Sequence, residues 1–283
     1  MTPNPPLRWR ISPLLGISLL LHAVLPALVL LAPHTWAWAL AALAANHLLL
    51  TLTGLWPRST WLGPNWTALP AAAAARNQIA LTIDDGPHPQ VTPQVLDMLD
   101  AYGVRATFFC IGEHAARYPA LCREIAERGH AVENHSQHHR HHFSLMGMAG
   151  LKREIQAGQA TLAAITGRAP QFFRAPAGLR NPCLDPVLAA CGLRLASWTR
   201  RGFDTRTAQP EVVAQRLLRG LRPGAILLLH DGNCARTAAG QAVILAVLPT
   251  LLQAAAAAGL RFVTLADALP ALPAIACMEG GVG

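Results

Sequence analysis

Two long apolar stretches near the start of the chain dominate its pattern of hydrophobic and polar positions. Residues 11–32 and 36–56 contain no charged side chain, and about 20 apolar residues are enough for a helix to cross the hydrocarbon core of a bilayer. The Pro-His-Thr segment between them is short enough for a tight turn. A cleaved signal peptide has a single apolar core of about 7–15 residues, so it fits this pattern less well. We therefore predict a transmembrane helical hairpin over residues 1–56, with spans at about 11–32 and 36–56.

Beyond a linker at residues 57–75, short apolar runs alternate with helical patterns. Strands are expected at 79–83, 106–111, 131–133, 171–174, 193–198, 225–229 and 262–265. Helices are expected at 92–102, 114–128, 151–166, 182–191, 210–221 and 241–258. Such alternation indicates parallel strands covered by helices. The pattern predicts an α/β fold of the irregular (β/α)7-barrel type over residues 76–270, followed by a tail at 271–283.

The first of these strands ends in two adjacent carboxylates, Asp84 and Asp85, before a Gly-Pro turn. Neighbouring carboxylates repel each other, so a fold that holds both needs a compensating cation such as a metal ion or an arginine. An Asx turn that closes the strand is the alternative explanation. In a parallel α/β fold the polar groups at the strand ends meet on one rim. Polar groups at the ends of the other strands would therefore favour a functional site over an Asx turn.

Histidines crowd the end of the third strand, with five of them in residues 135–142. His135 and His139 are four residues apart, so one helical turn would place both imidazoles on the same side of a metal. Two histidines and one carboxylate from Asp84 or Asp85 make a common catalytic zinc set with an open position. His138 and His142 have the same spacing, and the spacing does not choose between the pairs. A solvated histidine-rich loop is the alternative.

Two further strands end in titratable side chains, Arg174 and His230. Arg174 leaves an apolar run into a Pro/Gly turn and could hold a carboxylate ionised, or it could lie on the surface. His230 follows the apolar run 224–229, and on the same rim as a metal site it becomes a candidate general acid.

Together these residues resemble the NodB-homology polysaccharide deacetylases, carbohydrate esterase family 4, over roughly residues 76–269. The family motifs occur here in family order as Thr82-Ile-Asp-Asp-Gly86, His135-Ser-Gln-His-His139, Arg174-Ala-Pro-Ala-Gly178 and Leu228-Leu-His230. The resemblance favours His135 and His139 over the second pair. It implies a metal-dependent hydrolase that removes an N-acyl group, most simply N-acetyl, from a glycan or a lipid-linked sugar.

The resemblance also implies a role for each matching residue. Asp85, His135 and His139 would bind one divalent metal, Zn²⁺, with Co²⁺ or Ni²⁺ as substitutes. Asp84 would be the base that deprotonates the attacking water, held in place by Arg174. His230 would protonate the leaving amine. The backbone N–H of Ala177 would help to stabilise the oxyanion, and Leu228 would line the pocket for the acyl methyl group.

One segment departs from the family pattern. Family members often carry an acid-x-x-acid-Trp segment after the fifth strand, whereas this chain has Arg201 at the first acid and Thr205 at the tryptophan. Asp204 remains at the second acid and can orient His230. The altered pocket wall brings the usual substrate, a polymer of N-acetylglucosamine, into question.

The net charge and the cysteine content indicate which binding partners and which disulfides to expect. The net charge of +8 suits anionic lipid, whereas nucleic acid is not expected because no array of base-stacking aromatic and basic residues accompanies the charge. Most of the six cysteines are expected as free thiols, and a Cys183–Cys191 disulfide remains open.

Basic residues flank the hairpin only at its two ends (Arg8 and Arg10 before the first span, Arg58 after the second) and not at the turn between the spans. The positive-inside rule then places the catalytic domain on the cytoplasmic side of a bacterial inner membrane.

Other interpretations remain at this point. If one apolar stretch only lies in the interface, a single span leaves the domain periplasmic, where family enzymes act on finished cell-wall polymer. The same site could serve as an O-deacetylase or a deformylase of a lipid-linked saccharide. The fold could also be a catalytically silent glycan- or metal-binding module, although metal binding alone requires neither Asp84 nor Arg174 nor His230. A histidine-rich metal sensor would explain residues 135–142 but not the other strand ends.

Overall fold

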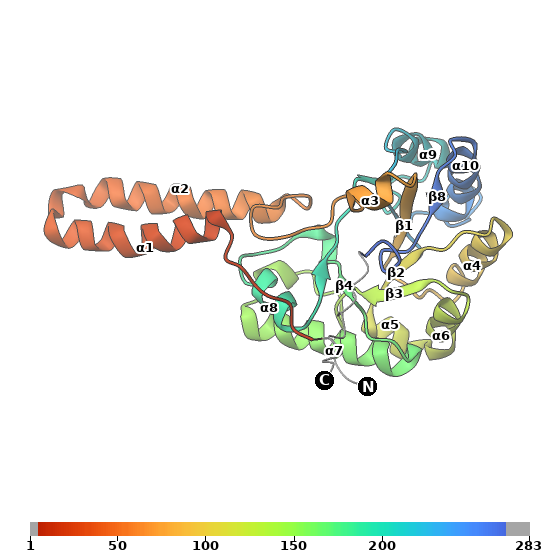
Figure 1. Ribbon diagram of the computed structural model, residues 1–283, viewed down its shortest axis with the longest axis horizontal. Coiled ribbons are helices and arrows are strands. Elements are labelled where there is room, and N and C mark those ends of the chain that lie inside the picture. Colours follow the sequence, from red (N-terminus) through yellow and green to blue (C-terminus); the bar gives the residue numbers. More distant parts are fainter. Residues whose placement is uncertain (1–4, 270–283) are drawn as a thin grey trace, which may run out of the picture.

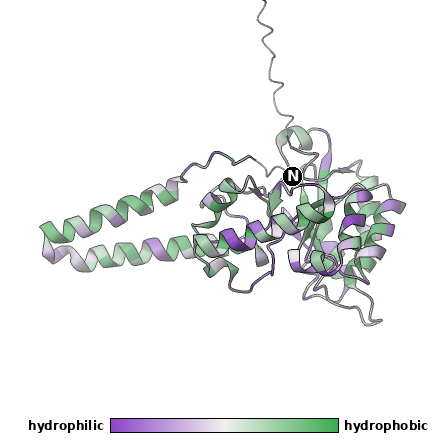
Figure 2. Cartoon of the chain, turned by 90° about the horizontal axis from the view of Figure 1, so that it is seen from below, coloured by the Kyte–Doolittle hydropathy of each residue, from purple (hydrophilic) through white to green (hydrophobic). Residues whose placement is uncertain are grey.

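An α-helical hairpin projects from one end of a curled α/β domain in the computed structural model, which describes residues 5–269 (Figure 1). Helix α1 (Pro13–Leu31) begins with Pro13 at its first position and with the backbone N–H of Leu15 donating to Ser12 Oγ at 3.3 Å. A single 3-10 turn, Pro33–Thr35, leads into α2 (Trp36–Leu55). Both helices are long and apolar enough to cross a membrane, and most of their residues are coloured as hydrophobic in Figure 2.

Two pairs of polar side chains meet between the two helices of the hairpin. Asn46 Nδ2 donates to Ser18 Oγ at 2.9 Å, and the Nε2 atoms of His22 and His47 lie 3.2 Å apart. In an apolar environment such interhelical hydrogen bonds satisfy groups that would otherwise be costly. The polar residues of the two stretches therefore agree with a paired hairpin.

A sheet of parallel strands forms the centre of the domain. The order along the sheet is β5-β4-β3-β2-β1-β7-β6, and β8 pairs with the start of β1. The strands are β1 (Gln78–Asp84), β2 (Thr107–Cys110), β3 (Ala131–Asn134), β4 (Phe172–Phe173), β5 (Arg194–Leu195), β6 (Arg200–Arg201), β7 (Ile226–His230) and β8 (Arg261–Phe262). The expected α/β class is confirmed, as an open, curled half-barrel.

Helices cover the outer face of this curled sheet (Figure 1). They are α4 (Thr92–Ala101), α5 (Gly112–Arg117), α6 (Pro119–Glu127), α7 (Met148–Thr166), α8 (Leu184–Ala190), α9 (Pro210–Leu218) and α10 (Val243–Ala257). The short helix α3 (Ala71–Ala74) is not one of them, because its buried Ala73 packs in the same cluster as Ala80. Because side chains alternate along a strand, β1 contributes to two layers. Ile79, Leu81 and Ile83 pack under the helices, whereas Ala80 belongs to a smaller inner cluster that includes Phe109.

Three elements differ from the sequence predictions. The single helix expected at 114–128 is two helices, because Pro119 disfavours a helical conformation at Tyr118, which has φ −127° and ψ 60°. Strand β6 was not expected, because two consecutive arginines lack the apolar pattern of a strand. It forms by backbone pairing with β7, in which Arg200 is registered with Leu227 and Arg201 with Leu228.

The third difference concerns the segment 57–75, predicted as a linker. It contains the short helix α3 and packs along the sheet, with Trp66 bridging to Ala196 and Ala68 to Ala225. The Trp66 ring also lies edge-on to Phe172, with 5.0 Å between the ring centroids. These contacts hold the hairpin close to the domain. The predicted tail at 271–283 lies outside the described residues.

Candidate active site

The strand ends place the predicted residues on one rim. Asp84 at the end of β1 is registered with His230 at the end of β7. Asn134 at the end of β3 is registered with Phe173 at the end of β4, so His135 and Arg174, which follow them, leave the sheet together. A cavity of about 460 Å³ opens at this rim. Its lining includes Asp84, Asp85, His135, His139, Ala177, Leu228 and His230.

Asp85, His135 and His139 form a compact group in which one ligand atom from each lies within 4.8 Å of the others. Asp85 Oδ1 is 3.3 Å from His135 Nε2 and 3.4 Å from His139 Nε2. This oxygen is buried and has no hydrogen-bond partner within the described chain. A buried acceptor without a donor, facing two imidazole nitrogens, fits a divalent cation with nitrogen and oxygen ligands.

The hydrogen bonds around the group leave the ligand atoms available. His135 Nδ1 lies 2.8 Å from the carbonyl oxygen of Arg174, so the proton belongs on Nδ1 and Nε2 is left bare. Burial lowers the pKa of His139 to about 4, which keeps this imidazole neutral. Burial opposes the charge of Asp85, but the neighbouring imidazole of His135 outweighs burial and lowers the pKa of this carboxyl group. Asn233 Nδ2 donates to Asp85 Oδ2 at 3.2 Å.

The helical turn expected to carry both histidines is wrong. Residues 135–139 form a loop in which Ser136 has φ 66° and His139 has φ 49°. The backbone N–H of His139 donates to Ser136 Oγ at 3.0 Å and fixes this loop. The competing histidine pair lies elsewhere, because His138 Nδ1 is held 2.8 Å from Glu154 Oε1 and His142 is exposed.

Arg174 is buried beneath Asp84 and is fully engaged. Its Nη1 donates to Asp84 Oδ1 at 2.6 Å and to Thr82 Oγ1 at 2.8 Å, and its Nη2 donates to the carbonyl of Ser197 at 2.7 Å. The guanidinium also lies 4.1 Å above the Phe109 ring. Arg174 therefore holds one oxygen of Asp84. The other, Oδ2, lies 3.9 Å from His135 Nε2 and faces the metal group.

Asp204 holds His230 by two hydrogen bonds. The backbone N–H of His230 donates to Asp204 Oδ2 at 2.7 Å, and His230 Nδ1 lies 3.0 Å from Asp204 Oδ1. Burial lowers the pKa of His230, but the Asp204 carboxylate outweighs it and raises that pKa to about 9. The imidazole is thus positively charged at neutral pH, with Nε2–H toward the cavity. Asp204 itself is completely buried.

Sequence reasoning missed several residues at this site. Asp231 is buried, accepts a hydrogen bond from Thr92 Oγ1, and lies against Gly86. His114 Nδ1 lies 3.0 Å from the carbonyl of Asp85. The repeated Asp-Gly after β1 and β7 was a signal for Asp231, whereas nothing in the sequence pointed to Thr92 or His114. Within residues 5–269 all cysteines are free, so Cys183 and Cys191 are not bridged.

Comparisons with known proteins agree with this geometry. The family model described as polysaccharide deacetylase matches residues 71–196. A chitooligosaccharide deacetylase of Azorhizobium caulinodans is 39% identical over 167 residues, which cover 57% of this chain and 78% of that protein. A peptidoglycan-N-acetylglucosamine deacetylase of Bacillus cereus is 33% identical over 193 residues, which cover 68% of this chain and 87% of that protein. The structure of a family 4 carbohydrate esterase from Streptomyces lividans superposes with a TM-score of 0.60 and 34% identity, covering 65% of this chain and 91% of that one.

Proposed function

Because the chain belongs to the polysaccharide deacetylase family, we propose that it hydrolyses the N-acetyl group from an N-acetylglucosamine unit of a glycan. One observation carries the proposal. A possible metal group (Asp85, His135, His139), a carboxylate held by arginine and an imidazole held by a carboxylate all face one cavity. A silent metal-binding module or a metal sensor would need only the first of these three parts.

Asp85, His135 and His139 would hold one divalent cation, and their nitrogen and oxygen donors suit zinc, with cobalt or nickel as substitutes. When bound, the ion supplies Lewis acidity that activates a water and stabilises negative charge on the acyl oxygen. The protein contributes the orientation of the ligands, through the His135 hydrogen bond to the backbone and the Asn233 hydrogen bond to Asp85.

Asp84 is the proposed general base. Arg174 occupies Oδ1 at 2.6 Å, which fixes the carboxylate and leaves Oδ2 to accept the proton of the attacking water. The water oxygen then bonds to the carbonyl carbon of the acetamide. The backbone N–H of Ala177, which lines the cavity in a left-handed conformation with φ 54°, would donate to the carbonyl oxygen as it gains negative charge.

His230 is the proposed general acid. Its charge at neutral pH follows from the Asp204 contact, and its Nε2 donates a proton to the amide nitrogen as the carbon–nitrogen bond breaks. Acetate and a free amino sugar leave. Leu228 is buried, pairs in register with Arg201 of β6 and lines the cavity, so it would contact the acetyl methyl group.

Acetate release from defined substrates tests the proposal. Purified protein loaded with zinc is incubated with N-acetylchitooligosaccharides, peptidoglycan fragments and O-acetylated xylan, and acetate is measured. We expect release from at least one N-acetylated glycan and at least a hundredfold loss in Asp84→Asn. Release only from the O-acetylated substrate would replace the N-deacetylase with an esterase. Release from none of them, with metal bound, would favour the silent module.

The hairpin suggests where the reaction occurs. Basic residues lie before the first helix and after the second, but not at the turn between them. We therefore propose that both ends of the hairpin, and the catalytic domain, lie on the cytoplasmic side of a bacterial inner membrane. Alkaline phosphatase fused after Gly283 should then be inactive, while a fluorescent protein at the same place should mature. An active phosphatase fusion would place the domain in the periplasm.

A further inference from the structure

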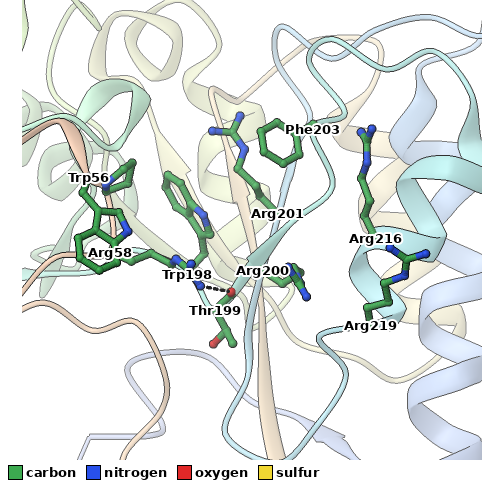
Figure 3. Close-up of a pocket in the computed structure, with 10 residues that line it drawn as sticks. Trp56, Arg58, Trp198, Thr199, Arg200, Arg201, Phe203, Arg216 and Arg219 are labelled. Carbon is green, nitrogen blue, oxygen red and sulfur yellow. Dashed lines mark hydrogen bonds between the residues drawn. The ribbon is translucent and has the colours of Figure 1, made fainter.

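A second cavity lies beside the catalytic one and is lined by five arginines (Figure 3). It has a volume of about 460 Å³. We call it the arginine pocket, and it contains Arg58, Arg200, Arg201, Arg216 and Arg219 together with Trp56, Trp198 and Phe203. Among the residues that the structure describes, no Asp or Glu lines it. Arginines brought together without carboxylates repel each other, so such a cavity favours an anionic ligand.

Three separate parts of the chain bring these cations together. In Figure 3, Arg58 lies on one side of the pocket, and Arg216 and Arg219 at the end of α9 lie on the other. Arg200 and Arg201 come from the edge strand β6 between them. Arg58 donates to the carbonyl of Thr199 at 3.2 Å.

The guanidinium groups are not neutralised by the protein. Within residues 5–269, none of the five arginines has a carboxylate oxygen within 4.0 Å. Arg201 is half-buried and stacks on Phe203, with 4.6 Å between guanidinium and ring centroid. Its buried Nε has no hydrogen-bond partner in the described part of the chain. Guanidinium groups held by aromatic rings, with free N–H groups, suit the paired hydrogen bonds of a phosphate.

The pocket lies between the end of α2 and the catalytic cavity. Trp56 directly follows α2, the second apolar helix, and tryptophan favours the interface between lipid and water. On the other side, Trp198, Arg201 and Phe203 line both the arginine pocket and the cavity that holds Asp85, His135 and His139. Arg201 therefore borders both the arginine pocket and the cavity of the metal group.

We propose that the arginine pocket binds the phosphate or pyrophosphate of a lipid-linked N-acetylamino sugar, while its sugar reaches the metal group and its lipid stays beside α2. This inference rests on the proposed deacetylation and specifies its substrate class. It also gives a physical reason for the arginine at position 201, where the family pattern has an acid, because a carboxylate there would repel the phosphate.

A selectivity measurement tests the proposal. Three substrates share one N-acetylglucosamine: a prenyl pyrophosphate conjugate, an alkyl glycoside with a lipid chain of similar length, and the sugar 1-phosphate without lipid. We expect kcat/KM to be at least tenfold higher for the prenyl pyrophosphate conjugate than for the alkyl glycoside. In Arg200→Gln/Arg219→Gln this ratio should fall by roughly tenfold or more, since each arginine–phosphate contact is charge-assisted. Inorganic pyrophosphate should compete with the conjugate in the wild type and compete more weakly in the variant.

Arg117→Gln/Arg153→Gln is the matched control, because both arginines are exposed and lie on α5 and α7, outside either cavity. It should keep the wild-type ratio. Equal ratios in all three proteins, with acetate still released, would overturn the phosphate site and leave the deacetylase standing. No release from any of the three conjugates or from the glycans would instead defeat the proposed function.

The phosphate could also come from the bilayer or from solution, and two arms separate these sources. If Arg200→Gln/Arg219→Gln loses binding to phosphatidylglycerol vesicles relative to phosphatidylcholine vesicles but keeps the substrate ratio, the pocket holds a membrane lipid and the substrate assignment is wrong. If the sugar 1-phosphate is preferred as strongly as the prenyl pyrophosphate conjugate, the substrate is soluble and the lipid part of the proposal is wrong.

Discussion

Replacing Asp204 by asparagine should convert His230 from a charged acid into a neutral side chain without changing the shape of the site. Asp204 accepts two hydrogen bonds from His230, at 2.7 Å from the backbone N–H and at 3.0 Å from Nδ1. Asparagine has one acceptor oxygen for these two donors. Once that oxygen accepts the backbone N–H, the amide NH₂ faces Nδ1 and favours the neutral imidazole with its proton on Nε2.

The pKa of His230 sets the size of the effect. Against the opposing effect of burial, Asp204, with further contributions from Asp85 and Asp84, raises this pKa from 6.5 to about 9, a difference that corresponds to ~3 kcal/mol. Without the carboxylate the pKa should be 6.5 or lower. The protonated fraction at pH 8 then falls from about nine-tenths to about 3%, whereas at pH 6 it falls only to about three-quarters.

Acetate release is measured from pH 5.5 to 9.5. In Asp204→Asn the alkaline limb of the kcat profile should shift to lower pH by about two pH units or more. The ratio of variant to wild-type kcat should be roughly 20-fold lower at pH 8 than at pH 6. Metal content should not change, because Asp204 is not in the Asp85, His135, His139 group. Asp97→Asn on the exposed face of α4 is the matched control. An alkaline limb at the same pH in the wild type and in Asp204→Asn would refute His230 as an acid held by Asp204.

Three further predictions concern other residues. Asp84→Asn should keep stoichiometric metal by elemental analysis while kcat falls by roughly 10²–10⁴-fold, because it removes the base and not a ligand; near-normal turnover would exclude this role. His135→Ala/His139→Ala should lose the metal, and retention of one ion per chain would move the site elsewhere. Burial lowers the pKa of His130 from 6.5 to about 4, so its contribution to stability is present above pH 6.5 and is lost as the pH falls through 4. The free energy of unfolding should therefore fall by about 3 kcal/mol more in the wild type than in His130→Gln over that range, and parallel pH curves would contradict this.

The sequence by itself determined most of the helices and strands and the identity of the strand-end residues. Alternating apolar runs and glycine stops place β1 and β7 within one or two residues of their ends, because buried strands and helix termini depend on local patterns. Uncharged stretches likewise gave the two hairpin helices. The resemblance then chose His135 and His139 over His138 and His142, a choice that spacing left open.

Only the tertiary structure decided how these groups meet. The histidine pair is presented by a loop with left-handed residues at Ser136 and His139, since the loop is fixed by contacts with β3 and the neighbouring strands rather than by helical spacing. Strand β6 exists through pairing with β7, which no local pattern encodes. The arginine pocket joins Arg58 to residues 200, 201, 216 and 219, which lie in a part of the chain far from it. Charge repulsion and ligand affinity depend on distances in space, so the chain's order alone could not reveal it.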